Sequence, residues 1–206
     1  GFIFAVEFNV YPYLQDAKPN SMHILWETDS ESQSIVEWGE YIFLSETTIG
    51  SSFSNYGTSR IHTVELVNLE PNTRYYYRVV LGDYESYSDL YDFVTPPEPS
   101  SEASFRIVAM SDMQRDGANP NKFNEVIHDG VIDYISDEHS DDLAGELAMV
   151  LVTGDLVVTG TSYYQWQDHF FGPAKDLLSF VPSYPVFGNH EQNTDYYINY
   201  FHLPDN

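Results

Sequence analysis

Cysteine is absent from the 206 residues of this chain. Without thiols the protein forms no disulfide, holds no thiolate metal site and uses no cysteine nucleophile. The sequence also lacks an apolar run long enough to cross a bilayer, so we expect no membrane insertion. It contains no glycine-rich loop of the kind that cradles phosphates and no internal repeat. A disulfide scaffold, a zinc finger and a P-loop nucleotide binder are therefore excluded.

Basic residues are scarce as well: 8 Lys and Arg stand against 32 Asp and Glu, and the formal net charge is -24. A general nucleic-acid binder needs a basic surface to meet the phosphate backbone, so we exclude nucleic acid as a partner. The same charge disfavours contact with anionic membranes. We interpret the acidity as a means of staying soluble in saline surroundings.

Aromatic residues, by contrast, are plentiful, with 13 Phe and 17 Tyr in a chain that is 42% hydrophobic. The N-terminal part contains short alternating runs separated by turn residues, such as Met22–Glu27, His62–Leu66 and Arg74–Val80. Several short strands of this kind in about 95 residues favour a β-sandwich.

The pattern changes at the proline-rich stretch Thr95–Glu102, after which strands and helices alternate. We therefore predict a two-domain protein. An all-β sandwich covers residues 1–95, a linker covers 96–103, and the N-terminal part of an α/β domain covers 104–206.

Helix signals in the second domain are local. Asn119 and Pro120 predict the capped start of one helix. Ser162–Phe171 predict another, which Gly172 and Pro173 are expected to end before a second short helix.

Polar side chains recur where apolar runs end. Asp112, Asp155 and Asn189 follow such runs at residues 105–110, 147–152 and 185–187, and each run is interpreted as a short buried strand. Open α/β sheets bind ligands at the carboxyl ends of their strands, so the three side chains should meet in one crevice. Oxygen ligands beside a histidine indicate divalent metal ions and hydrolysis.

The same positions form three boxes of a known family. Asp112-Met113-Gln114, Gly154-Asp155 and Gly188-Asn189-His190-Glu191 resemble, in this order, the first three boxes of the calcineurin-like metallophosphoesterases. The first domain resembles the fibronectin-III-type N-terminal domain of purple acid phosphatases, in the stretches 21–28, 36–39 and 69–79. The resemblance implies a fibronectin-III-like sandwich followed by a metallophosphoesterase domain, in a secreted, periplasmic or cell-surface protein.

The resemblance also implies a mechanism. Two divalent or mixed-valence metal ions (Fe, Mn or Zn) would share Asp155, with Asp112 and Gln114 on the first ion and Asn189 on the second. A hydroxide activated by this centre would attack the phosphorus of a phosphate ester in line. His190 would be catalytic, either stabilising the transition state or protonating the leaving oxygen.

Two residues depart from the family pattern. Gln114 stands where most relatives have histidine, and its role is open between a weaker carbonyl ligand and a bystander. Val158 stands where purple acid phosphatases have tyrosine, so no iron-tyrosinate chromophore is expected.

The chain begins at Gly1 and ends at Asn206, before two later histidine boxes of the family. We therefore expect part of a longer polypeptide that is nearly inactive alone, with its partner either the remainder of that polypeptide or another copy. The alternative is a non-catalytic extracellular structural or adhesive protein that reuses the fold. The remaining histidines match no box and are interpreted as surface or packing residues: His23, His62, His128, His139, His169 and His202.

Overall fold

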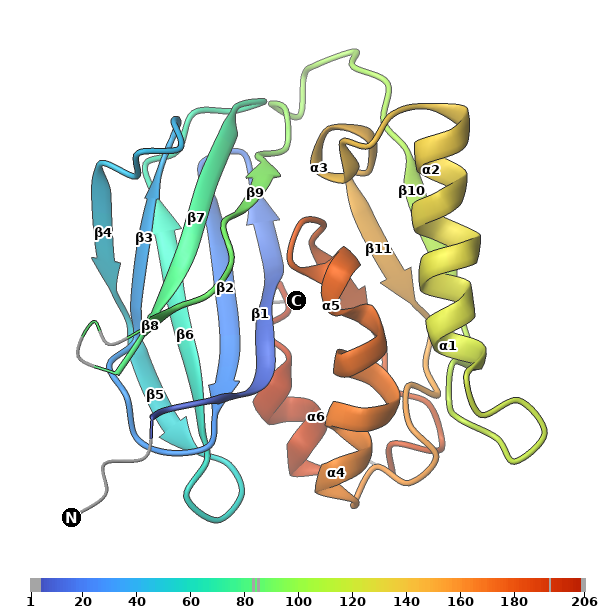
Figure 1. Ribbon diagram of the computed structural model, residues 1–206. Helices are drawn as coiled ribbons and strands as arrows, with labels where there is room; N and C mark the ends of the chain where they lie inside the picture. The colour runs from blue at the N-terminus through green and yellow to red at the C-terminus, as the bar shows by residue number, and fades with distance from the viewer. Residues whose placement is uncertain (1–4, 83, 85, 193, 205–206) are drawn as a thin grey trace.

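The computed structural model describes residues 5–82, 84, 86–192 and 194–204. It divides into a β-sandwich and an α/β region that lie side by side, joined by a loop that leaves β9 and enters β10 (Figure 1). The β-sandwich and the α/β region predicted from the sequence are both confirmed by this architecture.

Two antiparallel sheets make up the sandwich. The first has the order β1-β2-β6-β5, with bounds Phe8–Lys18, Ser21–Thr28, Arg60–Val67 and Ser51–Ser54. The second has the order β4-β3-β7-β8, with β9 also paired to β7. Its bounds are Glu46–Ile49, Ile35–Gly39, Arg74–Leu81, Ser86–Tyr87 and Tyr91–Val94.

Strand β2 is buried at every residue, which is unusual for a sandwich strand. Its even-numbered residues Met22, Ile24 and Trp26 belong to the core between the two sheets. On the opposite face, Leu25 belongs to a second apolar cluster, and most members of that cluster are buried residues of the α/β region. Because successive side chains point to opposite faces, burial on both sides means that the α/β region covers the outer face of this sheet.

The α/β region is built on a parallel sheet with strands in chain order: β10 (Ile107–Met110), β11 (Met149–Val152) and β12 (Ser183–Pro185). One helix between β10 and β11 runs through α1 (Lys122–Glu125), the π-helical η1 (Val126–Ile132) and α2 (Asp133–Glu138). A short α3 (Leu143–Glu146) follows it. The crossover from β11 to β12 runs through α4 (Tyr163–Gln165), η2 (Trp166–Phe171) and α5 (Gly172–Leu178), and α6 (Asp195–Tyr200) comes after β12.

Two helix predictions were wrong. The first helix begins at Lys122 rather than after Asn119, because the Asp116 carboxylate accepts the N–H groups of Ala118 and Asn119 and folds them into a turn. The second helix continues through Pro173. A π-helical turn, closed by the Gly172 N–H on the Gln167 carbonyl, precedes the proline and accommodates its missing donor.

Two of the apolar runs are less buried than predicted. Ile107 is 45% exposed because β10 pairs only with β11 and forms an edge of the described sheet. The third strand ends at Pro185, so Val186 and Phe187 lie beyond it and are exposed.

The two regions share an extensive interface along β1, which runs beside α5 (Figure 1). The Tyr13 ring packs on Phe171 with a centroid distance of 4.8 Å, and its hydroxyl donates to the Tyr200 carbonyl at 2.5 Å. Tyr77 donates to the Ser179 carbonyl at 2.7 Å. An interface this apolar and this well hydrogen-bonded leads us to expect that the two domains move as one body.

A buried carboxylate lies in the middle of this interface. Glu27 is 0% exposed, and both of its oxygens accept hydrogen bonds from side chains of the two regions. The donors are Asn55, Ser59, Tyr163, Gln167 and Tyr200, at 2.7–3.3 Å. A buried charge with this many donors is satisfied, and it ties the sandwich to α4, η2 and α6.

Candidate metal centre

The loops after β10, β11 and β12 carry the residues singled out in the sequence. Met110 is paired with Val152 and Val152 with Pro185, so the three strands end level with one another. Asp112 leaves the first strand and Asp155 the second. The third loop carries Asn189 and His190. The parallel sheet therefore delivers all three boxes to one edge.

Backbone hydrogen bonds connect the three loops. The Asp112 N–H donates to the Gly154 carbonyl at 3.3 Å, and the Gln114 N–H donates to the Asp155 carbonyl at 2.9 Å. The third loop is held through a side chain, because the His190 N–H donates to Asp155 Oδ1 at 3.2 Å. Asp155 is thus the central residue of the edge, in contact with both neighbouring boxes.

Two glycines allow this close approach. A Cβ on Gly154, whose φ is +100°, would lie 2.9 Å from the Gly188 Cα. A Cβ on Gly188 would lie 2.1 Å from Asp155 Oδ1. Any side chain at either position would push the second and third loops apart, which explains why a glycine precedes both Asp155 and Asn189.

The two aspartates have strained backbones. Asp112 has φ 57° and Asp155 has φ 56°, in the left-handed region that residues other than glycine rarely adopt. Such strain is tolerated when the surrounding structure imposes it, and it clusters at functional sites. The hydrogen bonds between the loops are what impose it here.

Glu191, the last residue of the third box, is the main brace of the edge. It is 0% exposed, and its carboxylate accepts only backbone N–H groups. Oε1 accepts from Leu156 at 2.7 Å and Val157 at 3.1 Å, whereas Oε2 accepts from Asp155 at 3.0 Å and Gly188 at 2.6 Å. One side chain therefore fixes the backbone of two loops. Our sequence interpretation included Glu191 in the box but gave it no role.

His190 is held in one tautomer. Its Nδ1 lies 2.7 Å from the Val158 carbonyl, and because a carbonyl oxygen can only accept, Nδ1 carries a proton. Nε2 has no hydrogen-bond partner among the described residues. It is the nitrogen left for a ligand or for proton transfer.

Gln114 has a side-chain oxygen without a partner. Its Oε1 is buried and accepts no hydrogen bond, although an orphaned buried acceptor is costly. A cation bound beside Asp112 and Asp155 would satisfy it. Carboxylate, amide and carbonyl oxygens are the donors that hard divalent ions prefer, so these residues fit a metal.

The ligand set at this edge is sparse in charged groups. In the part of the chain that the structure describes, no three Asp, Glu, His or Cys ligand atoms gather here within 4.8 Å. The edge offers two carboxylates, together with the neutral amides Gln114 and Asn189.

A cavity of about 350 Å³ lies beside the first box. Its lining includes Met113 and Arg115, together with residues at the start of α1 and with Asp168 and His169 of η2. Burial lowers the pKa of His169, and the positive charge of Arg115 lowers it further. Sequence patterns do not predict this cavity, because its lining residues come from segments far apart in the chain.

Comparison with known proteins identifies both regions. Residues 8–95 match the family model "Purple acid Phosphatase, N-terminal domain", and residues 105–206 match "Calcineurin-like phosphoesterase". The chain is 26% identical over 209 residues to "Probable inactive purple acid phosphatase 27" of Arabidopsis thaliana, over 89% of this chain and 33% of that protein. It therefore spans about a third of the length of this curated relative.

Solved structures share the fold. The purple acid phosphatase PPD1 from yellow lupin (Lupinus luteus) seeds superposes with a TM-score of 0.70 at 23% identity, over 88% of this chain and 35% of that one. PhoD superposes with a TM-score of 0.55 at 13% identity, over 92% of this chain and 40% of that one. No described helix is both long and apolar enough to cross a membrane. The chain belongs to the calcineurin-like phosphoesterases and carries the N-terminal domain of the purple acid phosphatases in front of that fold.

Proposed function

We propose that the protein is a metal-dependent hydrolase of phosphate esters, acting at the edge formed by the loops after β10, β11 and β12. The observation that carries this proposal is the orphaned, buried Oε1 of Gln114, a residue whose backbone N–H is bonded to Asp155, in loops where Asp112 and Asp155 both have strained backbones. Both aspartates adopt the left-handed backbone at neighbouring strand ends, and strain of this kind clusters at functional sites. The family supplies the reaction class.

Four residues would hold the ions. Asp155 would be shared between two ions, Asp112 and Gln114 would bind the first, and Asn189 the second. When bound, such ions polarise the phosphoryl group and neutralise its developing charge. The metal charge also has to attract the substrate, because the chain's own net charge of -24 repels an anionic ester.

The chain's own groups would position the rest of the reaction. His190 Nδ1–H is committed to the Val158 carbonyl, so Nε2, when protonated, would donate to the leaving oxygen. Glu191 would act as a positioning residue, since it contacts only backbone N–H groups of the loops. Arg115, in the adjacent cavity, would attract the non-reacting part of an anionic ester.

A non-catalytic role is the second candidate. The Arabidopsis relative is named as probably inactive, and two of the four proposed ligands in this chain are neutral amides. Amide oxygens hold metal ions more weakly than carboxylates or imidazoles do. A protein that keeps the fold but not the turnover would bind metal poorly at this edge and act through its surface.

The test combines metal analysis with phosphatase assays on the full-length polypeptide that contains this chain, supplied with Fe, Mn or Zn. An aryl phosphate monoester and a diester serve as substrates. We expect turnover in the parent and a loss to background in Asp155→Asn, together with a fall in metal content. In His190→Ala we expect a loss of roughly 10²–10⁴-fold, with metal content retained.

His139→Gln is the matched control, because His139 is exposed and lies after α2, away from the boxes. It should leave both readouts unchanged. A parent that binds little metal and turns over neither substrate would establish the non-catalytic alternative. Unchanged activity in Asp155→Asn would show that the site lies elsewhere.

A further inference from the structure

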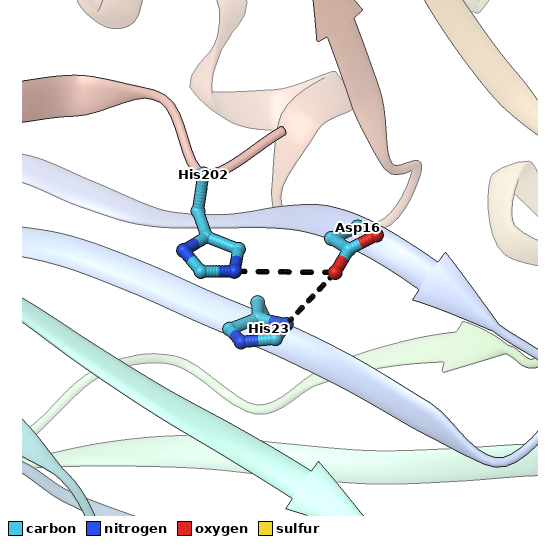
Figure 2. Close-up of side chains that lie close together, drawn as sticks. All are labelled: Asp16, His23 and His202. Carbon is cyan, nitrogen blue, oxygen red and sulfur yellow. Dashed lines mark ion pairs between the residues drawn. The ribbon is translucent and has the colours of Figure 1, made fainter. Parts of the chain in front are cut away.

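A second group of ligand-type side chains lies at the interface between the two domains. Asp16 of β1 and His23 of β2 come from the sandwich, and His202 follows α6 (Figure 2). Asp16 Oδ2 lies 3.7 Å from His23 Nδ1 and 3.9 Å from His202 Nε2. One ligand atom from each residue falls within 4.8 Å of the other two. This is the one such group in the described part of the chain.

The local backbone directs Asp16 into this position. The register of β1 against β2 shifts between Gln15 and Lys18, and Asp16 has φ 44° in the left-handed region. A bulge of this kind turns a side chain away from its regular alternation. As a result the Asp16 carboxylate is buried, at 3% exposed, and both histidines approach the same oxygen (Figure 2).

His23 carries an unexplained buried atom. The residue is 6% exposed, and its Nδ1 has no hydrogen-bond partner. The contact with Asp16 at 3.7 Å is too long to be a hydrogen bond. Buried nitrogens without a partner are rare in native structures and indicate a missing ligand or ion.

A second proton on the His23 ring is disfavoured. Burial lowers the pKa of His23, and the neighbouring His202 lowers it further, against the opposing effects of Glu65 and Asp16. The rings of His23 and His202 stack with a centroid distance of 4.0 Å and an interplanar angle of 20°. Two charged imidazolium rings would repel each other in that arrangement. A neutral imidazole, in contrast, presents the lone pair that a metal needs.

Lys18 is the present counter-charge of Asp16. Its Nζ lies 2.8 Å from Asp16 Oδ2, and its side chain is 52% exposed. A lysine of that exposure can swing into solvent when a more strongly charged ion arrives. The lysine therefore competes with a cation for Asp16 without excluding it.

We propose that Asp16, His23 and His202 form a binding site for a divalent transition metal of the zinc class, which staples the two domains together. Two imidazoles and one carboxylate suit Zn²⁺, Co²⁺ or Ni²⁺. They do not suit Ca²⁺ or Mg²⁺, which prefer oxygen ligands. Bonds of about 2.0–2.2 Å place tetrahedral ligand atoms roughly 3.3 Å apart. The separations from Asp16 are 3.7 and 3.9 Å, and the two histidine nitrogens lie within 4.8 Å of each other, so metal binding needs a contraction and a rotation of one ring out of the stack.

His202 can supply that contraction. Its side chain is 47% exposed, and it lies on the segment after α6, outside both sheets. The exposed side also leaves a fourth position open to water. Because two ligands come from the sandwich and one from the α/β region, the bound ion would stabilise the docked arrangement of the domains.

The test must distinguish this site from the candidate metal centre at the loops after β10, β11 and β12. The parent chain therefore carries Asp112→Asn and Asp155→Asn, which remove the carboxylates of that edge and keep residues that tolerate a left-handed backbone. Zinc binding is measured by calorimetry, and the visible absorption of added Co²⁺ reports the coordination geometry. Thermal unfolding is followed with and without zinc.

We expect one zinc per chain, a tetrahedral cobalt spectrum and a higher melting temperature with zinc. His202→Gln should weaken zinc binding at least tenfold and abolish the thermal shift. His202 is exposed, so this variant should fold normally, and its melting temperature without zinc checks that it does. His23→Gln and Asp16→Asn should act in the same direction, whereas His139→Gln should not. Absence of stoichiometric binding in the parent, or full binding in His202→Gln, would overturn the proposal.

Discussion

Glu27 and Glu191 are both fully buried carboxylates, but their hydrogen-bond donors are of different kinds. Glu27 lies between the domains and accepts hydrogen bonds only from side chains. Glu191 lies under the candidate metal centre and accepts only from backbone N–H groups. Side chains can rotate to new partners, but a backbone N–H moves only when its loop moves. Glu27 therefore holds surfaces together, and Glu191 determines the conformation of the loops themselves.

The largest loss of stability is expected for a substitution at Glu191. In Glu191→Gln an NH₂ group replaces one oxygen, so two backbone N–H donors face another donor whichever way the amide is turned. We expect a loss of about 3–5 kcal/mol in the free energy of unfolding, as when a buried charged partner is removed. Urea denaturation measures the loss, and amide exchange at Leu156 and Val157 should accelerate.

Glu98→Gln, in the exposed linker, is the matched control and should leave stability unchanged. A Glu191→Gln protein as stable as the parent would remove the distinction between the two carboxylates.

His62, in strand β6 of the sandwich, is expected to make the stability of the protein depend on pH. Burial lowers the pKa of His62 to about 4, with a further contribution from Arg60. Thr28 Oγ1 already donates to the Ser30 carbonyl, so it accepts from His62 Nε2 at 2.8 Å, and Nδ1 receives the Ser34 hydroxyl at 2.8 Å. The native ring is therefore neutral.

Between pH ~6.5 and about 4 the unfolded chain binds a proton at His62 that the folded chain does not, so stability falls as the pH falls. We expect a loss of roughly 2–3 kcal/mol over this window, measured by denaturation at a series of pH values. His62→Gln should lower stability at pH 7 and flatten the pH dependence. A pH dependence that stays equally steep in that variant would assign the effect to other groups.

Glu27→Gln should cost less than Glu191→Gln, about 1–2 kcal/mol. The hydroxyls of Tyr163, Tyr200 and Ser59 can reverse direction and accept from the new NH₂ group, and the change also removes a buried charge. Urea denaturation gives the number for comparison with Glu191→Gln. If the two variants lose the same stability, the adaptability of side-chain partners is not the reason for the difference.

The smallest effect is expected for Tyr163→Phe. The Tyr163 hydroxyl donates to Glu27 at 3.1 Å and accepts from Asn9 at 2.9 Å. Its removal leaves Glu27 with four donors and should cost about 0.5–1.5 kcal/mol in denaturation experiments. Tyr164→Phe, at an exposed neighbouring ring, is the control. A loss as large as that of Glu27→Gln would mean that the Glu27 network fails as a unit.

Sequence patterns predicted the elements that depend on local periodicity. The alternation in β2 and β6 and the strand-end position of Asp112, Asp155 and Asn189 were sufficient to predict a sandwich and a parallel sheet with polar loops at one edge. They did not predict that both faces of β2 are covered, because an alternating strand carries no mark of what packs on its outer face.

The missed features depend on contacts between distant segments. Glu191 acts on backbone N–H groups more than 30 residues earlier in the chain. His23 and His202 were interpreted as surface or packing residues, because a stack between two domains cannot be inferred from either histidine alone. No sequence pattern predicts the bulge that turns Asp16 toward these histidines. Helix ends were missed where side-chain turns, such as that of Asp116, compete with helix caps.

The left-handed backbones of Asp112 and Asp155 have a consequence for the history of this fold. Glycine adopts such a conformation without steric cost, so replacing either aspartate by glycine would relieve on the order of 1 kcal/mol. A lineage that had lost every ligand at this edge would be driven by stability alone toward glycine at both positions. Aspartate kept at both positions across relatives would thus record selection for a ligand, independently of any assay, and drift to glycine would mark the branches that retain only the scaffold.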